Sequence, residues 1–148
     1  PEIRISGSDP NPVIIACGSM VAEAYRACRM LAKEGLYPML VNARFIKPLD
    51  TKMLRMLLEE ENIHTLIMAE EGVETGGFGS SVVEYCTKYF PRKQMQYIIK
   101  ALPDTFIEHG NRRDLLRKYK LDAEGIADEV RQQIRTGDKY ICEYTNRP

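Results

Sequence analysis

Short apolar runs alternate with amphipathic segments through the middle of the chain. VIIAC (13–17) is continuously apolar, and PMLVNA (38–43) and TLIMA (65–69) are mostly so, which is typical of strands buried on both faces. MQYIIKAL (95–102) supplies a fourth such run, and the segments between the runs carry apolar residues at helical spacing. Strands that alternate with helices imply crossover connections and parallel pairing. The pattern predicts an α/β fold, a three-layer α/β/α arrangement with a mostly parallel sheet.

Side chains suited to helix capping mark where several helices begin. Asp50, Asn111 and Asp122 each precede a segment with helical periodicity, and Asp and Asn are favoured N-cap residues. Gly137 follows the last periodic segment, so the final helix is predicted to end there.

The two ends of the chain carry weaker signals than its centre. The 148 residues suit one domain of ordinary size, with a core over about 12–136. IRIS (3–6) alternates apolar and polar residues and is predicted to form an edge strand, whereas 137–148 carries no signal that assigns it. The first residue is Pro1 rather than methionine, so we expect a segment of a longer protein.

Charge and hydropathy exclude two classes of partner. Lys plus Arg and Asp plus Glu each number 21, and a net charge of zero argues against nucleic-acid binding, which rests on surplus basic side chains. No run approaches the ~20 apolar residues of a membrane span, and the N-terminus lacks the layout of a signal peptide. We therefore expect no nucleic-acid and no membrane partner.

The cysteines do not form a metal-binding or disulfide pattern. None of the four belongs to a C-x-x-C pair, and the two histidines lie far apart in the sequence. Structural thiols in a reducing compartment are the favoured interpretation, and no metal site is predicted. The cysteines are Cys17, Cys28, Cys86 and Cys142.

The segment EEGVETGGFGSS (70–81) lies between a predicted strand and a predicted helix and is rich in glycine. It lacks the lysine of a Walker loop, and Val82 stands where a dinucleotide fingerprint needs its third glycine. The favoured interpretation is that the glycines permit a tight turn and close packing at the helix start. An anion held by the free amides at Ser80–Ser81 is the alternative.

Glu70 and Glu71 are adjacent on an extended segment, so their side chains point to opposite faces and do not form a facing acid–base pair. We expect one of them to point inward and bond a backbone amide or a cation such as Arg44. The other is expected in solvent or at an interface.

Two further positions carry weaker signals. Gly18 and Ser19 follow the first buried strand, where open α/β sheets commonly bind ligands, but a helix start explains both. His109 lies in a loop, where an ordinary hydrogen bond is favoured over catalysis. No nucleophile with a base, metal set or complete phosphate loop is recognisable in the sequence.

Three blocks at fixed order and spacing resemble one family. Together they resemble the C-terminal domain of the 1-deoxy-D-xylulose-5-phosphate synthases, which are transketolase-like thiamine-diphosphate enzymes. The first two blocks are shared with transketolases and 2-oxo acid dehydrogenase β-subunits, whereas the third separates the synthases from these relatives. The resemblance covers roughly residues 12–134. The blocks are ARFIKPLD (43–50), AEEGVETGGFGSSVVEY (69–85) and LPDTFIEHGNRRDLLRKYKLDAEGI (102–126).

The resemblance implies a function for a parent enzyme rather than for this chain alone. Such enzymes condense pyruvate with glyceraldehyde 3-phosphate, release carbon dioxide, and supply isoprenoid, thiamine and pyridoxal synthesis with thiamine diphosphate and Mg²⁺ as cofactors. Their G-D-G motif is absent here. No catalytic, cofactor-binding or metal residue is therefore assigned, and the chain alone is expected to be non-catalytic. The alternatives are the corresponding domain of a transketolase or a 2-oxo acid dehydrogenase β-subunit, or a free-standing module that binds an anion or nucleotide.

The resemblance also implies an architecture and partners. It implies a five-stranded mixed sheet with one antiparallel strand, which 3–6 could supply, in a cytoplasmic protein of bacterial type. The expected partners are the other domains of the same chain and a second subunit of a homodimer. Phe78 is expected to be exposed for such a contact, because one rigid ring buries much area at little entropic cost. The residues expected at the interface or in its loops are Arg44, Glu70, Glu71, Gly76, Gly77, Phe78 and His109.

Overall fold

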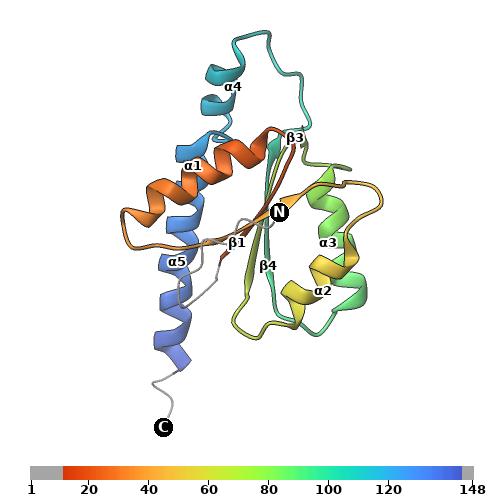
Figure 1. Cartoon of the computed structure of the whole chain (residues 1–148), viewed down its shortest axis with the longest axis vertical. Helices are drawn as coiled ribbons and strands as arrows, with labels where there is room; N and C mark the ends of the chain where they lie inside the picture. The colour runs from red at the N-terminus through yellow and green to blue at the C-terminus, as the bar shows by residue number, and fades with distance from the viewer. Residues whose placement is uncertain (1–11, 145–148) are drawn as a thin grey trace.

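The protein forms a parallel β-sheet with helices on both faces (Figure 1). The structure, a computed structural model, describes the backbone of residues 12–144 and the side chains as far as residue 135. In this part of the chain the strand order is β2-β1-β3-β4, and all three neighbouring pairs are parallel. The strands are β1 (Val13–Cys17), β2 (Met39–Ala43), β3 (Thr65–Val73) and β4 (Gln96–Leu102).

The predicted α/β fold with a parallel sheet is confirmed. The described residues form a four-stranded sheet rather than the five-stranded mixed sheet that was expected. The fifth, antiparallel strand was assigned to 3–6, which lies outside the described residues and stays a prediction.

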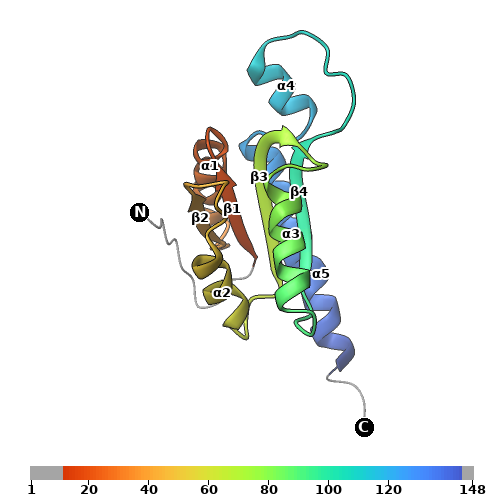
Figure 2. The same ribbon diagram turned by 90° about the vertical axis from the view of Figure 1, so that its right-hand side faces the viewer.

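Helices cover the two faces of the sheet in pairs. Helices α1 and α5 pack on one face, and α2 and α3 pack on the other (Figures 1 and 2). Helix α4 lies beyond the end of the sheet, next to the start of α5. None of the helices formed by the described residues combines the length and the apolarity needed to cross a bilayer. The helices are α1 (Met20–Ala32), α2 (Thr51–Glu59), α3 (Phe78–Tyr89), α4 (Arg112–Lys118) and α5 (Ala123–Tyr144).

The continuous apolar run of β1 serves two separate cores. Ile14 and Ala16 contribute to the cluster beneath α1 and α5, whereas Val13 and Ile15 contribute to the cluster beneath α2 and α3. Successive strand side chains point to opposite faces, so a central strand covered on both faces needs apolar residues at every position.

The three predicted helix caps are confirmed. The side chains of Asp50, Asn111 and Asp122 each accept a backbone N–H from the first turn of α2, α4 and α5, at 3.0, 2.9 and 3.0 Å respectively. The predicted end of the last helix was wrong, because α5 continues through Gly137 to Tyr144. Glycine weakens a helix interior by only about 1 kcal/mol relative to alanine, so a single glycine does not terminate a helix by itself.

Candidate functional site

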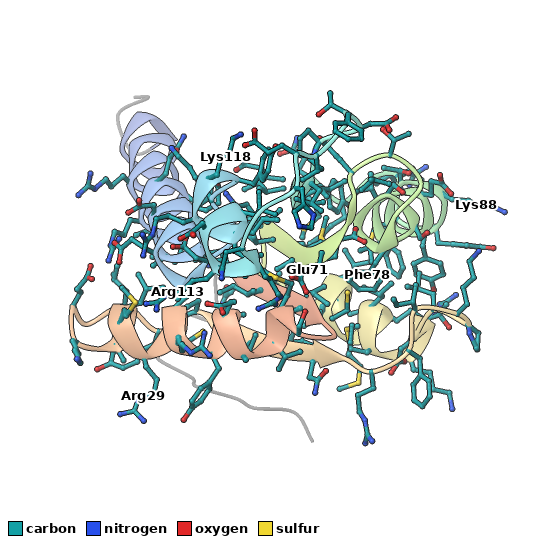
Figure 3. The ribbon with its side chains drawn as sticks, turned by 90° about the horizontal axis from the view of Figure 1, so that it is seen from above. Arg29, Glu71, Phe78, Lys88, Arg113 and Lys118 are labelled. Carbon is teal, nitrogen blue, oxygen red and sulfur yellow. The ribbon has the colours of Figure 1, made fainter. Side chains whose placement is uncertain are left out.

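The carboxyl ends of the parallel strands meet at one edge of the sheet, which Figure 3 shows from above. This edge is formed by the turn between β1 and α1, the loop 44–50 after β2, the end of β3 and the loop 103–111 after β4. Open α/β sheets commonly bind ligands at such an edge. It is also where the three family-like sequence blocks come together, so it is the candidate functional site.

Glu70 fills the anion position at the start of α3. Strand β3 extends beyond the predicted run 65–69, so Glu70 is part of the strand, and its side chain is only 4% exposed. The two carboxylate oxygens accept the backbone N–H groups of Phe78 at 2.9 Å and Gly79 at 2.7 Å. These are free amides at a helix N-terminus, where a bound phosphate would otherwise be stabilised. The expectation that one glutamate bonds backbone amides is therefore met by Glu70.

The glycines of this segment leave room for that carboxylate. A Cβ atom on Gly77 would lie 2.7 Å from both carboxylate oxygens of Glu70 and closer still to the carbonyl oxygen of Val73. A Cβ atom on Gly72 would lie 2.5 Å from one of the same carboxylate oxygens. Gly76 has a φ of +76°, a left-handed conformation that L side chains disfavour. The glycines thus serve a tight turn and close packing, as the favoured interpretation predicted.

The two serines at the start of α3 are also engaged within the chain. The hydroxyl groups of Ser80 and Ser81 each donate to the carbonyl oxygen of Gly77 at 3.0 Å. A carboxylate holds the amides of Phe78 and Gly79, and the N–H of Ser81 donates to the carbonyl oxygen of Gly77 at 3.3 Å, so these three amides of the first turn already have partners within the chain.

Glu71 links three elements that are distant in the sequence. Its carboxylate accepts a hydrogen bond from the Ser19 hydroxyl, in the turn before α1, and one from Arg112 Nε of α4 at 2.7 Å. The hydrogen bond from Arg112 is the main cause that lowers the pKa of the Glu71 carboxyl group below its ordinary value. Glu71 lies between α1 and α4 in Figure 3. Its pairing within the chain was not anticipated from the sequence.

Among the residues expected at the interface or in its loops, Phe78 is buried, whereas Arg44 and His109 are exposed. The prediction that Phe78 is exposed was wrong: it is 1% exposed and belongs to the core beneath α2 and α3. The reason is that Glu70 holds the first turn of α3 against the sheet, which places the first side chain of the helix inside. Arg44 is exposed on loop 44–50, and Glu70 is held by amides rather than by this cation. His109 is exposed on loop 103–111.

The comparison with protein families identifies this architecture. The model described as "Transketolase, C-terminal domain" matches residues 2–126. The chain belongs to this family. The resemblance inferred from the three sequence blocks is therefore confirmed at the level of the family.

Curated relatives show which transketolase C-terminal domains are similar. A 1-deoxy-D-xylulose-5-phosphate synthase from Aquifex aeolicus is 44% identical over 126 residues, which are 84% of this chain and 19% of the relative. The synthase from Chlorobium luteolum is 41% identical over 134 residues, which are 90% of this chain and 20% of the relative. The chain thus spans about a fifth of the length of these relatives.

Solved structures support the same fold. A chain described as a split-gene transketolase, inactive beta4 tetramer, is 28% identical with a TM-score of 0.71, and the match covers 86% of this chain and 39% of that chain. A transketolase variant from Pichia stipitis is 18% identical with a TM-score of 0.62 over 89% of this chain and 17% of that chain, which shows the fold alone.

This transketolase C-terminal domain also exposes apolar side chains at the same edge. Phe45 and Ile46 of loop 44–50 are 63% and 49% exposed, and Phe106 of loop 103–111 is 95% exposed. These residues were not among the predicted contact residues, although they lie inside ARFIKPLD (43–50) and the block 102–126, which carry the family resemblance. Each lies in an apolar pair that is flanked by polar residues, which is too short to indicate a strand or a helix face.

The described cysteine thiols are poor nucleophiles in this domain. Burial raises the pKa of Cys28 and of Cys86 to about 11, and burial together with the charge of Glu70 raises that of Cys17. The thiolate is the reactive form of cysteine, so these side chains are unreactive at neutral pH. Among residues 12–135, moreover, no group of three His, Cys, Asp or Glu side chains is arranged to hold a metal ion.

Proposed function

We propose that this chain is the C-terminal assembly domain of a 1-deoxy-D-xylulose-5-phosphate synthase. The parent enzyme condenses pyruvate with glyceraldehyde 3-phosphate and releases carbon dioxide, with thiamine diphosphate and Mg²⁺ bound outside this domain. The support is the identity of 36–44% to synthases of this name over 80–90% of the chain. In this proposal the domain is non-catalytic by itself, and the enzyme works in the cytoplasm.

The main support for the assembly role is that the protein's own side chains occupy the carboxyl edge of the sheet. At the two helix starts next to the central strands, Glu70 bonds the amides of α3 and Glu71 bonds the hydroxyl of Ser19 before α1. The usual ligand position of an open α/β sheet is thus occupied by the protein's own carboxylates. The loops around it expose large apolar side chains instead, which suits contact with protein rather than with a small substrate.

The proposed partners are the remaining domains of the same polypeptide and a second subunit. The chain matches only 19–20% of the synthases from Aquifex aeolicus and Chlorobium luteolum. The similar split-gene transketolase is described as an inactive tetramer, so a chain that contains such a domain assembles without activity in that protein. A homodimer of the parent enzyme is the simplest assembly that covers the exposed loops.

The alternatives receive less support. The similar transketolases are 18% and 28% identical to this chain, whereas the synthases are 36–44% identical. A free-standing anion-binding module would need open helix starts at Ser19 or Ser80. Both serine hydroxyls instead donate hydrogen bonds within the chain.

The proposal is tested by reading the genomic sequence upstream of the codon for Pro1 and expressing the complete polypeptide that it encodes. With thiamine diphosphate and Mg²⁺, the complete polypeptide should consume pyruvate and glyceraldehyde 3-phosphate in equal amounts and release carbon dioxide. The 148-residue chain should do neither under the same conditions. Turnover by the 148-residue chain alone, or a complete polypeptide that acts on other substrates, would refute the proposal.

A further inference from the structure

A cavity of about 630 Å³ lies between α1, α4 and the start of α5, beside the Glu71–Arg112 pair. Figure 3 shows Arg113 between α4 and α1 at this position, whereas Arg29 of α1 points away from the molecule. Three of the lining residues are apolar and the other seven are charged. The lining residues are Glu23, Arg26, Met30, Arg112, Arg113, Leu116, Arg117, Asp122, Ala123 and Glu124.

The acidic side chains of the cavity are all committed to partners. Glu23 accepts from Arg26 Nη1 at 2.5 Å and from the backbone N–H of Ala123 at 3.2 Å. Asp122 caps α5, and Glu124 pairs at 2.9 Å with an arginine of α5 outside the cavity. Each of the three negative charges is therefore offset by a cation or by backbone amides that it already contacts.

Two of the four arginines are not paired in this way. Arg26 bonds Glu23, and Arg112 bonds Glu71 at 2.7 Å. Within the part of the chain that the structure describes, no carboxylate lies within ion-pair distance of Arg113 or Arg117. These two residues are four apart on α4, so their side chains lie on the same helix face, one turn from each other.

We propose that this cavity binds a small phosphate monoester, with Arg113 and Arg117 holding the phosphate group. Two uncompensated guanidinium groups match a ligand that carries two negative charges on one head group. A phosphate monoester is such a dianion at neutral pH, since its second pKa is ~6. The planar guanidinium donates two parallel hydrogen bonds to phosphate oxygens, which lysine cannot do.

The apolar part of the cavity suits the organic portion of the ligand. Met30 of α1, Leu116 of α4 and Ala123 of α5 line it, and Leu116 is buried in the core beneath α1 and α5. These three apolar side chains can contact the carbon atoms of a small ligand, while the charged residues of the lining contact its head group. None of the lining residues belongs to loop 44–50 or loop 103–111, so the proposed ligand site does not depend on the proposed assembly role.

The test is a calorimetric titration of the 148-residue chain with glycerol 2-phosphate at low ionic strength, with glycerol and sulfate as comparison ligands. Glycerol 2-phosphate should bind and glycerol should not. Affinity for glycerol 2-phosphate should rise about tenfold as the pH increases through ~6, because the monoester becomes a dianion. Affinity for sulfate, which is a dianion throughout, should not follow this rise.

Substitutions separate a specific site from general attraction of anions. The double variant Arg113→Gln/Arg117→Gln should lower the affinity for glycerol 2-phosphate by about tenfold or more. The double variant Arg113→Lys/Arg117→Lys keeps both charges and should show an intermediate loss of affinity. It still tests the proposal if the Gln variant does not fold. Arg29→Gln removes one positive charge from α1 outside the cavity and should leave the affinity unchanged.

Three outcomes would overturn the proposal. One is absence of binding in the wild-type chain, and another is an equal loss of affinity in the Arg29→Gln variant. The third is tight binding of a polyglutamate peptide with none of glycerol 2-phosphate, which would make the arginines a docking surface for an acidic protein segment.

Discussion

The carboxylate of Glu70 lies 2.7 Å from the backbone nitrogen of Gly79 and accepts its N–H. A side chain of β3 therefore occupies the position that a phosphate takes in the nucleotide-binding members of the α/β class. The neighbouring Glu71 points the other way and bonds Ser19 and Arg112. One glutamate dipeptide thus fixes the starts of two helices and one end of α4.

Removal of the Glu70 charge should destabilise the domain. Glu70→Gln replaces one acceptor oxygen by an NH₂ group that cannot accept the N–H it would face, so a buried amide loses its partner. We expect a loss of about 2 kcal/mol in the free energy of unfolding, or a Tm lower by about 4–8 °C. Urea denaturation followed by circular dichroism measures it. Glu74→Gln, at an exposed position nearby, is the matched control, and equal stability of the two variants would contradict the assigned role.

Gly77 lies so close to Val73 and Glu70 that a larger residue at this position should destabilise the turn. Gly77→Ala would force its methyl group against the Val73 carbonyl oxygen and the Glu70 carboxylate, and overpacking of this kind costs about 1–3 kcal/mol. Gly110→Ala meets no atom closer than 3.5 Å and should be neutral or slightly stabilising. Thermal unfolding of the two variants side by side gives the comparison. A tolerated alanine at position 77 would mean that the turn can move away from Glu70.

Some of these features could be predicted from the sequence because their causes are local. Asp50 and Asn111 cap helices that begin one residue later, so the residue type and the following periodicity suffice. The buried strands were recognisable because the apolar runs are short and lie between turn residues, and their length favours strands over helices.

The rest depends on contacts between residues far apart in the sequence. Glu71 and Arg112 are 41 residues apart, and nothing in either segment specifies the other as a partner. Phe78 was expected to be exposed because its neighbours are glycines, but its direction is set by the hydrogen bond between its own amide and Glu70. The Arg113–Arg117 cavity likewise requires the packing of α4 against α1 and α5.

The Glu71–Arg112 pair should make a pH-dependent contribution to stability. The folded-state pKa of Glu71 is lowered, chiefly by Arg112, so its contribution is present above the unfolded pKa of ~4.3 and is lost as the pH falls through the folded value. Because the pair is partly exposed, we expect about 0.5–1 kcal/mol at neutral pH. The measurement is the difference in unfolding free energy between wild type and Glu71→Gln, which should shrink toward zero below about pH 4.

A double-mutant cycle isolates the pair. Arg112→Gln and Glu71→Gln together should cost less than the sum of the two single changes, and added salt should reduce this coupling. A coupling that is absent at neutral pH, or that grows as the solution is acidified, would show that Arg112 does not hold Glu71 in solution.

The buried thiols should be protected from modification. With a pKa of about 11, Cys28 and Cys86 carry roughly 300-fold less thiolate at neutral pH than an ordinary cysteine with a pKa of ~8.5. Burial also restricts the access of a reagent to both thiols. In a Cys142→Ser variant, iodoacetamide should label the remaining cysteines only after denaturant is added. Mass spectrometry after a timed quench measures the labelling. Modification of either residue in the native state at the rate of free cysteine would contradict their burial.

The exposed loops should act in assembly rather than in folding. Phe106→Ser removes a side chain that is 95% exposed, so the unfolding free energy of the 148-residue chain should change by less than about 0.5 kcal/mol. In the complete polypeptide, loss of an aromatic anchor should weaken subunit association by about tenfold or more. Sedimentation velocity over a dilution series measures the dissociation constant, with Met56→Gln on the outer face of α2 as the control, since Met56 is also exposed. If Phe106→Ser instead lowers the Tm of the complete polypeptide without changing its association, loop 103–111 contacts another domain of the same chain. An unchanged Tm and an unchanged dissociation constant would remove this loop from the proposed interface.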